Sequence, residues 1–138
     1  MAGQARKPRL LYTLVCDDVR QEVGDKISLM GLFDSIYAPV LPAFHPRIVV
    51  VNAWGSGRGR FQSTIRLLGP GRELVGDLGA AEFELADESR FHRHVAFHLN
   101  WQITSPGTYW IEVLLDGTRE ALVPLQVVSG GPVSAAIH

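Results

Sequence analysis

Apolar and polar residues alternate along most of the chain, and a period of two predicts β-strands rather than helices. The clearest stretch is residues 91–103. Its odd positions are mainly apolar (Phe91, Val95, Phe97, Leu99, Trp101, Ile103) and its even positions mainly polar (His92, His94, Ala96, His98, Asn100, Gln102). Because neighbouring strand side chains point to opposite faces, we expect the odd set to face a core and the even set to face solvent.

The stretch 91–128 organises the chain, and we expect it to form three consecutive antiparallel strands. Asp116-Gly117 joins the last two, since this dipeptide suits a tight hairpin turn with positive φ at both central positions. Pro124 lies inside the last strand. Proline has no amide hydrogen for a sheet ladder, so this strand is predicted at a sheet edge or at a bulge.

Further strands are predicted at residues 10–17, 27–33, 47–54 and 60–68, with one or two more within 74–85. Gly31 indicates a bulge or a close backbone approach within its strand. Three prolines mark residues 34–46 as a loop that crosses between sheets. About eight closely spaced strands predict an all-β fold, an antiparallel two-sheet β-sandwich. The 138 residues suit a single domain, 1–138, with flexible tails at 1–8 and 129–138.

Two segments carry a resemblance to a known family. One is Leu14-Val15-Cys16-Asp17-Asp18 with the following run 26–34, and the other is Pro106-Gly107-Thr108-Tyr109 with Asp116-Gly117 and the run 124–127. Together they resemble a family of small bacterial proteins of uncharacterised function. The resemblance implies a β-sandwich, for which we expect an immunoglobulin-like or C2-like Greek key. It implies no catalytic residues.

Composition limits the classes of function. The net charge is −1, which gives no global electrostatic basis for nucleic-acid or anionic-membrane binding. The sequence shows no secretory signal and no run long enough to span a membrane, so we expect a cytoplasmic protein. The single cysteine, Cys16, excludes an intrachain disulfide, and its apolar run predicts a buried, unreactive thiol. No cofactor is expected.

Three candidate sites contain side chains that can bind a metal ion or an anion. His92, His94 and His98 share a parity, and two of them at i and i+2 can ligate a metal, although a polar face is the alternative. Arg58 and Arg60 in a glycine-rich loop, with Arg66 and Arg72 nearby, can contact an anion. Carboxylates around the first hairpin can hold calcium, unless they only form turns (Asp17, Asp18, Asp25, Asp34).

Several strands are apolar on both parities, and Trp110, Leu114, Met30 and Leu32 lie on the faces that a sandwich would leave outside. Loops or a partner can cover such faces. No side chains show the spacing of a nucleophile with its base, so we do not expect an enzyme. We expect a non-catalytic interaction or assembly module, as a homo-oligomer or with another protein. The alternative is a loop-based module that binds calcium or an anionic group such as phosphate.

Overall fold

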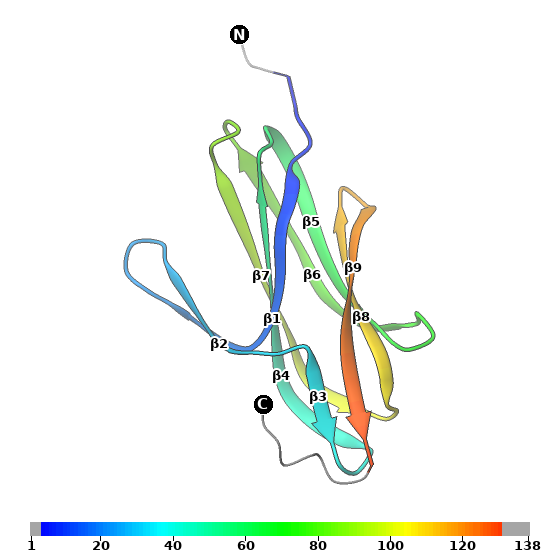
Figure 1. Cartoon of the computed structure of the whole chain (residues 1–138). Coiled ribbons are helices and arrows are strands. Elements are labelled where there is room, and N and C mark those ends of the chain that lie inside the picture. The colour runs from blue at the N-terminus through cyan, green and yellow to red at the C-terminus, as the bar shows by residue number, and fades with distance from the viewer. Residues whose placement is uncertain (1–3, 131–138) are drawn as a thin grey trace.

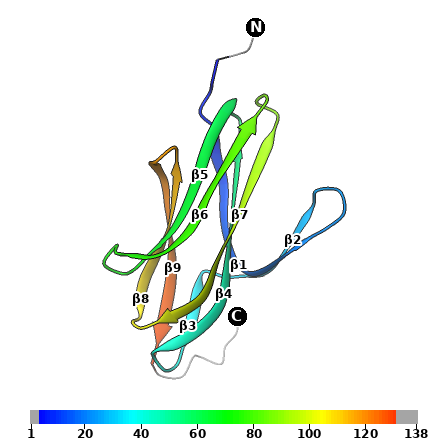
Figure 2. The same cartoon turned by 180° about the vertical axis from the view of Figure 1, so that it is seen from behind.

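The computed structural model describes residues 4–130, which form nine strands arranged as two facing layers (Figures 1 and 2). The strands are β1 (Arg9–Gln21), β2 (Ile27–Leu32), β3 (Ser35–Ala38), β4 (Ala43–Gly55), β5 (Gly59–Leu68), β6 (Leu74–Leu85), β7 (Phe91–Ile103), β8 (Gly107–Leu115) and β9 (Thr118–Ser129). The predicted all-β class is therefore confirmed. Within the described residues no helix is long and apolar enough to cross a membrane.

The strands form one antiparallel sheet and one mixed sheet. The first has the order β2-β1-β4-β7, and the second has the order β3-β9-β8-β5-β6. The pair β3–β9 is parallel, so the expectation of a wholly antiparallel fold is wrong for this sheet. β3 also corrects the prediction that residues 34–46 are only a crossing loop, and β4 already begins within that range.

The core lies between the two sheets, and β4 contributes its largest fully buried side chain, Trp54. Ile48 and Val50 of the same strand meet Ile65 and Ile111 of the opposite sheet in one cluster. β-Branched residues suit this role because their stiff side chains pack well on a pleated surface.

The predicted faces of β7 are reversed over most of its length. His94 and Ala96 are buried, whereas Phe97 and Leu99 are exposed. At Asn100, which has a φ of +55°, the alternation is interrupted, and Trp101 returns to the core. β7 also pairs with β4 rather than with β8, so residues 91–128 do not form three neighbouring strands of one sheet.

The predictions made from turn residues and glycines agree better with the observed backbone. Asp116 and Gly117 have φ values of +49° and +82°, as the predicted hairpin turn requires. Gly31 has a φ of +72°, and a Cβ there would collide with the carboxylate of Asp17, which confirms the predicted close approach. Pro124 pairs with Trp110 of β8, whereas β3 pairs with β9 only from Gln126 onward. Pro124 therefore lies on the unpaired part of the β9 edge.

The chain ends differ partly from the predicted tails. The amide of Arg6 donates to the carbonyl of Arg58 and the amide of Arg58 donates to the carbonyl of Arg6, at 2.7 and 2.9 Å, so this part of 1–8 is held against the β4–β5 turn. Ser129 still belongs to β9. Residues 1–3 and 131–138 of the predicted tails lie outside the described residues.

The connection from β7 to β8 is fixed by a tyrosine. Tyr109 is buried, and its hydroxyl donates a 2.7 Å hydrogen bond to the carbonyl oxygen of Ser105, four residues earlier. Its ring packs edge-on against Trp101, with the centroids 5.1 Å apart. This contact joins the end of one sheet to the start of a strand in the other.

Replacing Tyr109 with phenylalanine should lower the free energy of unfolding by about 1 kcal/mol, because the buried ring stays but the Ser105 carbonyl loses its donor. Urea denaturation monitored by tryptophan fluorescence measures this. Tyr12→Phe is the matched control, since the Tyr12 hydroxyl accepts an exposed hydrogen bond from the Arg93 side chain. Equal losses in both variants would contradict a structural role for the Tyr109 bond.

Candidate functional site

The side of the β2-β1-β4-β7 sheet that faces away from the core carries several exposed apolar side chains, interrupted by Arg47, Arg93 and Gln102. We use the term outer face for five side chains on this side that are 43–69% exposed: Leu11, Phe44, Phe91, Phe97 and Leu99. Phe91, Phe97 and Leu99 share one parity of β7. Leu11 and Phe91 would both touch a Cβ placed on Gly55, so β1 continues the same surface.

Beneath the outer face lies a second small cluster formed by Cys16, Val49 and Val51, all fully buried. Val95 of β7 and Leu29 of β2 pack against it. Burial raises the pKa of the Cys16 thiol, so the predicted buried cysteine is confirmed and the thiol stays protonated at neutral pH. The outer face thus lies over a fully buried apolar cluster.

The β1–β2 hairpin projects from the body of the molecule (Figures 1 and 2). β2 pairs with β1 only from Cys16 onward, and Cys16 is also the last residue of β1 that pairs with β4. Met30 is half-buried, Leu32 is exposed, and Val23 in the turn is 90% exposed. Two of the predicted interaction residues, Met30 and Leu32, therefore lie on this arm.

The other two, Trp110 and Leu114, belong to the second sheet. The guanidinium of Arg72 lies 4.4 Å from the centre of the Trp110 ring, and Leu114 is buried. Between them on the strand, Glu112 accepts ion pairs from Arg119 at 2.9 Å and from Arg66 at 3.7 Å. The larger set of exposed apolar side chains is therefore on the β4–β7 side and not around Trp110.

Sequence reasoning missed the outer face because it assigned the odd positions of β7 to the core. A signal was nevertheless present, since both parities of residues 48–51 are apolar. A strand with two apolar faces in a two-sheet protein requires apolar neighbours on its outer side as well.

The histidines face inward instead of forming a solvent-facing polar row. His92 stacks on Phe83 with the ring centroids 4.4 Å apart. His94 Nδ1 lies 2.9 Å from the hydroxyl of Ser63, which also accepts a 3.1 Å hydrogen bond from Trp54 Nε1. His92 and His94 point the same way as predicted, but no three potential metal ligands gather among the described residues.

Burial lowers the pKa of His94, and the neighbouring His92 lowers it further. Burial likewise lowers the pKa values of His92 and His98. All three imidazoles are therefore neutral at pH 7, and they pack in the structure as uncharged aromatic rings.

Most of the predicted anion and calcium ligands either form ion pairs with other side chains or lie at separate places in the fold. Arg58 pairs with Glu88, whereas Arg60 lies exposed in a depression that also contains Glu82 and Asp116. Asp18 pairs with Arg47 at 3.2 Å. The remaining carboxylates lie at three separate places: beside Gly31 (Asp17), in the β1–β2 turn (Asp25) and at the β2–β3 crossing (Asp34).

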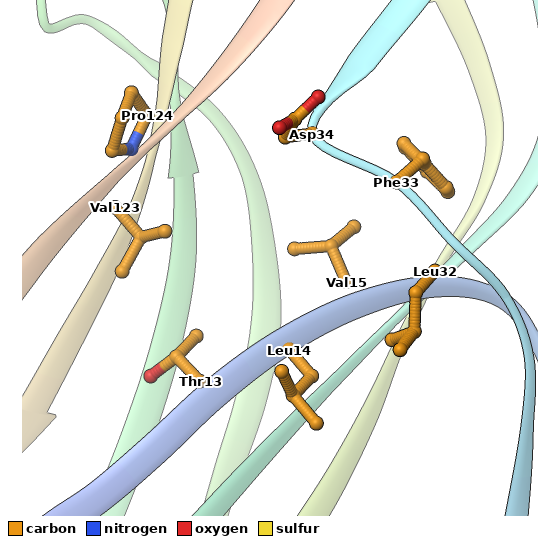
Figure 3. A pocket seen from close by; sticks show the side chains of 8 residues that line it. All are labelled: Thr13, Leu14, Val15, Leu32, Phe33, Asp34, Val123 and Pro124. Atoms are coloured by element: carbon orange, nitrogen blue, oxygen red, sulfur yellow. The ribbon is translucent and has the colours of Figure 1, made fainter. Parts of the chain in front are cut away.

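A second surface feature is a slot between β1 and β9, next to the β2–β3 crossing (Figure 3). Its lining comes from three segments: β1 (Thr13, Leu14, Val15), the β2–β3 crossing (Leu32, Phe33, Asp34) and β9 (Val123, Pro124). Thr13 is half-buried, but its hydroxyl oxygen is fully buried and has no hydrogen-bond partner among the described residues.

The buried histidines make stability depend on pH. Their pKa values are lowered from 6.5 in the folded state. The unfolded chain therefore binds more protons than the folded chain as the pH falls below 6.5, and the free energy of unfolding decreases there. Above pH 7 this contribution is fully present.

His94→Gln should flatten the fall in unfolding free energy between pH 7 and pH 5, compared with wild type. Urea titrations at four pH values measure the slope of the unfolding free energy against pH. A loss of stability that is the same at every pH does not change this slope. His45→Gln is the control. An unchanged slope in His94→Gln would mean that His94 titrates equally in both states.

Comparison with known proteins gives a family and a distant fold relative. No curated protein matches the chain. Among solved structures, the Pseudomonas fluorescens alkylpurine DNA glycosylase AlkC, bound to DNA containing an abasic site analog, aligns with a TM-score of 0.51. The identity is 11%, and the alignment covers 92% of this chain but 32% of the glycosylase chain. This likeness concerns the fold alone.

The family comparison covers most of the molecule. A model of a family of unknown function, DUF6941, matches residues 11–128, which extend from β1 to β9 and include both sheets. This match agrees with the expectation of an uncharacterised family. The chain belongs to the family DUF6941.

Proposed function

We propose that this chain is a non-catalytic interaction module that associates with a second copy of itself through the outer face. The observation that carries the proposal is the exposure of Phe91 and Phe97 beside Leu99 on one side of β7. Charged or polar residues usually occupy the solvent side of a sheet. A flat apolar face is complementary to its own copy across a two-fold axis, since the same surface serves both partners.

The size of the outer face supports this reading. The exposed fractions of its five side chains sum to roughly 500 Å² of apolar surface, within which Arg47 and Arg93 also lie. Two copies would bury roughly 1,000 Å², which reaches the lower limit for a specific interface. We expect a reversible dimer.

The non-catalytic part of the proposal is supported by the state of the reactive side chains. The Cys16 thiol is buried and its pKa is raised. His94 is held between Ser63 and the core, and Glu112 is paired with two arginines. Each of these groups is therefore buried in the core, hydrogen-bonded or ion-paired within the fold.

Two structural features favour an immunoglobulin-like rather than a C2-like sandwich. The Tyr109–Ser105 bond has the form of a tyrosine corner, in which a tyrosine near the start of a strand binds the backbone a few residues earlier. The strands β1, β4 and β7 form one sheet opposite β5, β8 and β9, as in sandwiches of this class. A bacterial origin and a cytoplasmic location remain parts of the proposal.

Leu99→Glu and Phe97→Glu should each convert the dimer to a monomer, because each would bury an ionised carboxylate in an apolar interface. Size-exclusion chromatography with light scattering over 5–500 µM (about two decades around the expected weak affinity) measures the mass. Leu74→Glu is the matched control, since Leu74 is 61% exposed but lies in the other sheet.

Wild-type protein that remains a monomer at every concentration would overturn the self-association proposal. Loss of the dimer in Leu74→Glu alone would place the interface on the second sheet.

The alternative, a loop-based module for calcium or phosphate, makes a different prediction. Millimolar calcium or phosphate should leave the melting temperature unchanged if the chain is an interaction module. A ligand present at a hundred times its dissociation constant would instead stabilise the fold by about 2.7 kcal/mol. Differential scanning fluorimetry distinguishes the two, with magnesium chloride and sodium sulfate as ionic controls.

A further inference from the structure

One side of the molecule leaves two strands without a complete set of neighbours. β2 pairs with β1 only between the partners Cys16–Leu32 and Gln21–Ile27. Residues 9–15 of β1 therefore have β4 on one side and no strand of the described chain on the other. On β9, the neighbour β3 begins at Gln126, so residues 118–125 are open in the same way. The slot lies between these two open edges (Figures 1 and 3).

Both ends of the slot are closed. At one end the chain crosses between the sheets, where Phe33 N donates to Val15 O and Gln126 N donates to Asp34 O, each at 3.0 Å. At the other end Lys7 Nζ lies 2.8 Å from a carboxylate oxygen of Glu120. The nine residues from Lys7 to Val15 span about 26 Å at the usual rise of a strand, so this edge of β1 is long enough to pair with a short extended peptide.

The hydrogen bonds at the crossing show which backbone groups face the slot. Because Val15 O points toward the crossing, the peptide groups of Val15 and Thr13 are directed to the slot side, as alternate residues are in a ladder. On β9 the Gln126 amide donates to Asp34 O at the crossing. The peptide groups of Pro124 and Leu122, which alternate with it along the strand, are therefore directed to the slot side as well. Pro124 has no amide hydrogen, which protects that edge from pairing. β1 is therefore the edge that can accept a strand.

The side chains that line the slot favour a segment with apolar residues and one positive charge. The slot is lined mainly by apolar atoms, with Val15 and Val123 from opposite sheets (Figure 3). The buried hydroxyl oxygen of Thr13 has no partner among the described residues, although a buried polar atom normally has one. At the crossing end, the only charged side chain among the lining residues is Asp34, whose carboxylate accepts a 3.3 Å bond from Ser35.

We propose that the slot binds an extended peptide segment of a partner protein, which adds as a strand beside residues 9–15 of β1, in line with β2. Main-chain hydrogen bonds to Thr13 give the pairing, and alternate apolar side chains enter between Val15 and Val123. A lysine or arginine at one end of the segment meets Asp34. The slot opens between the sheets, whereas the outer face lies on the far side of β4, so this proposal does not rest on self-association.

The direct test is a titration of ¹⁵N-labelled full chain with the hexapeptide acetyl-Lys-Val-Thr-Val-Thr-Val-amide. We expect saturable shifts of the Thr13, Val15 and Val123 amides, and slower hydrogen exchange at Thr13. Replacing the lysine of the peptide by glutamate should weaken binding by at least about threefold. Asp34→Asn should remove this difference. The peptide acetyl-Lys-Val-Pro-Val-Pro-Val-amide, which cannot pair as a strand, should not bind.

A matched pair of proline variants identifies the accepting edge. Thr13→Pro and Leu122→Pro each remove one amide hydrogen that faces the slot, the first on β1 and the second on β9. Binding should be lost in Thr13→Pro and retained in Leu122→Pro, with circular dichroism to verify that both fold. If Thr13→Pro does not fold, protection of the Thr13 amide in the wild type decides the same question.

Three results would overturn the proposal. The first is the absence of saturable shifts with the lysine hexapeptide up to millimolar concentration. The second is shifts confined to the outer face. The third is a loss of binding in Leu122→Pro with normal binding in Thr13→Pro. None of these results would affect the mass measured for the dimer, so the two proposals can fail separately.

Discussion

The fold depends on the burial of β4 on both of its faces. Ile48, Val50 and Trp54 enter the core between the sheets, while Val49 and Val51 are equally inaccessible on the opposite side. Burying one such side chain contributes roughly 1.5–3 kcal/mol, so both faces of β4 act as hydrophobic anchors. The inner face is covered by a whole sheet. The opposite side of β4 is covered only by side chains of the neighbouring strands, and Phe97 and Leu99 beside it stay exposed. The proposed interface is a consequence of this arrangement.

Polar contacts fix how the two sheets align. Trp54 and His94 come from one sheet, and both bind the hydroxyl of Ser63 from the other. Hydrogen bonds inside a core impose a specific geometry that apolar packing alone does not. The other constraint between the sheets is the crossing at Phe33 and Asp34, which ties β1 to β9 at one level. Above that level the edges separate and the slot begins, so the same crossing that closes the fold also defines the slot.

Local signals in the sequence were sufficient for much of the fold. Alternation predicted most strands, and Asp116-Gly117 and Gly31 predicted backbone conformations that the structure contains. The errors concern information that is not local. Alternation groups the residues of β7 into two faces but does not say which face is inside, and Asn100 exchanges them partway along the strand. His94 can be buried because its Nδ1 is hydrogen-bonded to the hydroxyl of Ser63, thirty-one residues earlier, and no spacing rule reveals that pairing. The four-residue β3 is held by β9, whose sequence lies about ninety residues further on.

The central claim is that the outer face of the β2-β1-β4-β7 sheet is an interface between copies of this chain. An amide NMR dilution series on the wild-type protein tests it most directly, because it locates the contact without any substitution. The account predicts concentration-dependent shifts at Val49, Val95 and Phe97, with constant shifts on β5 and β6. Spectra that do not change on dilution of a monomer, or shifts confined to the β5–β6 side, would contradict it.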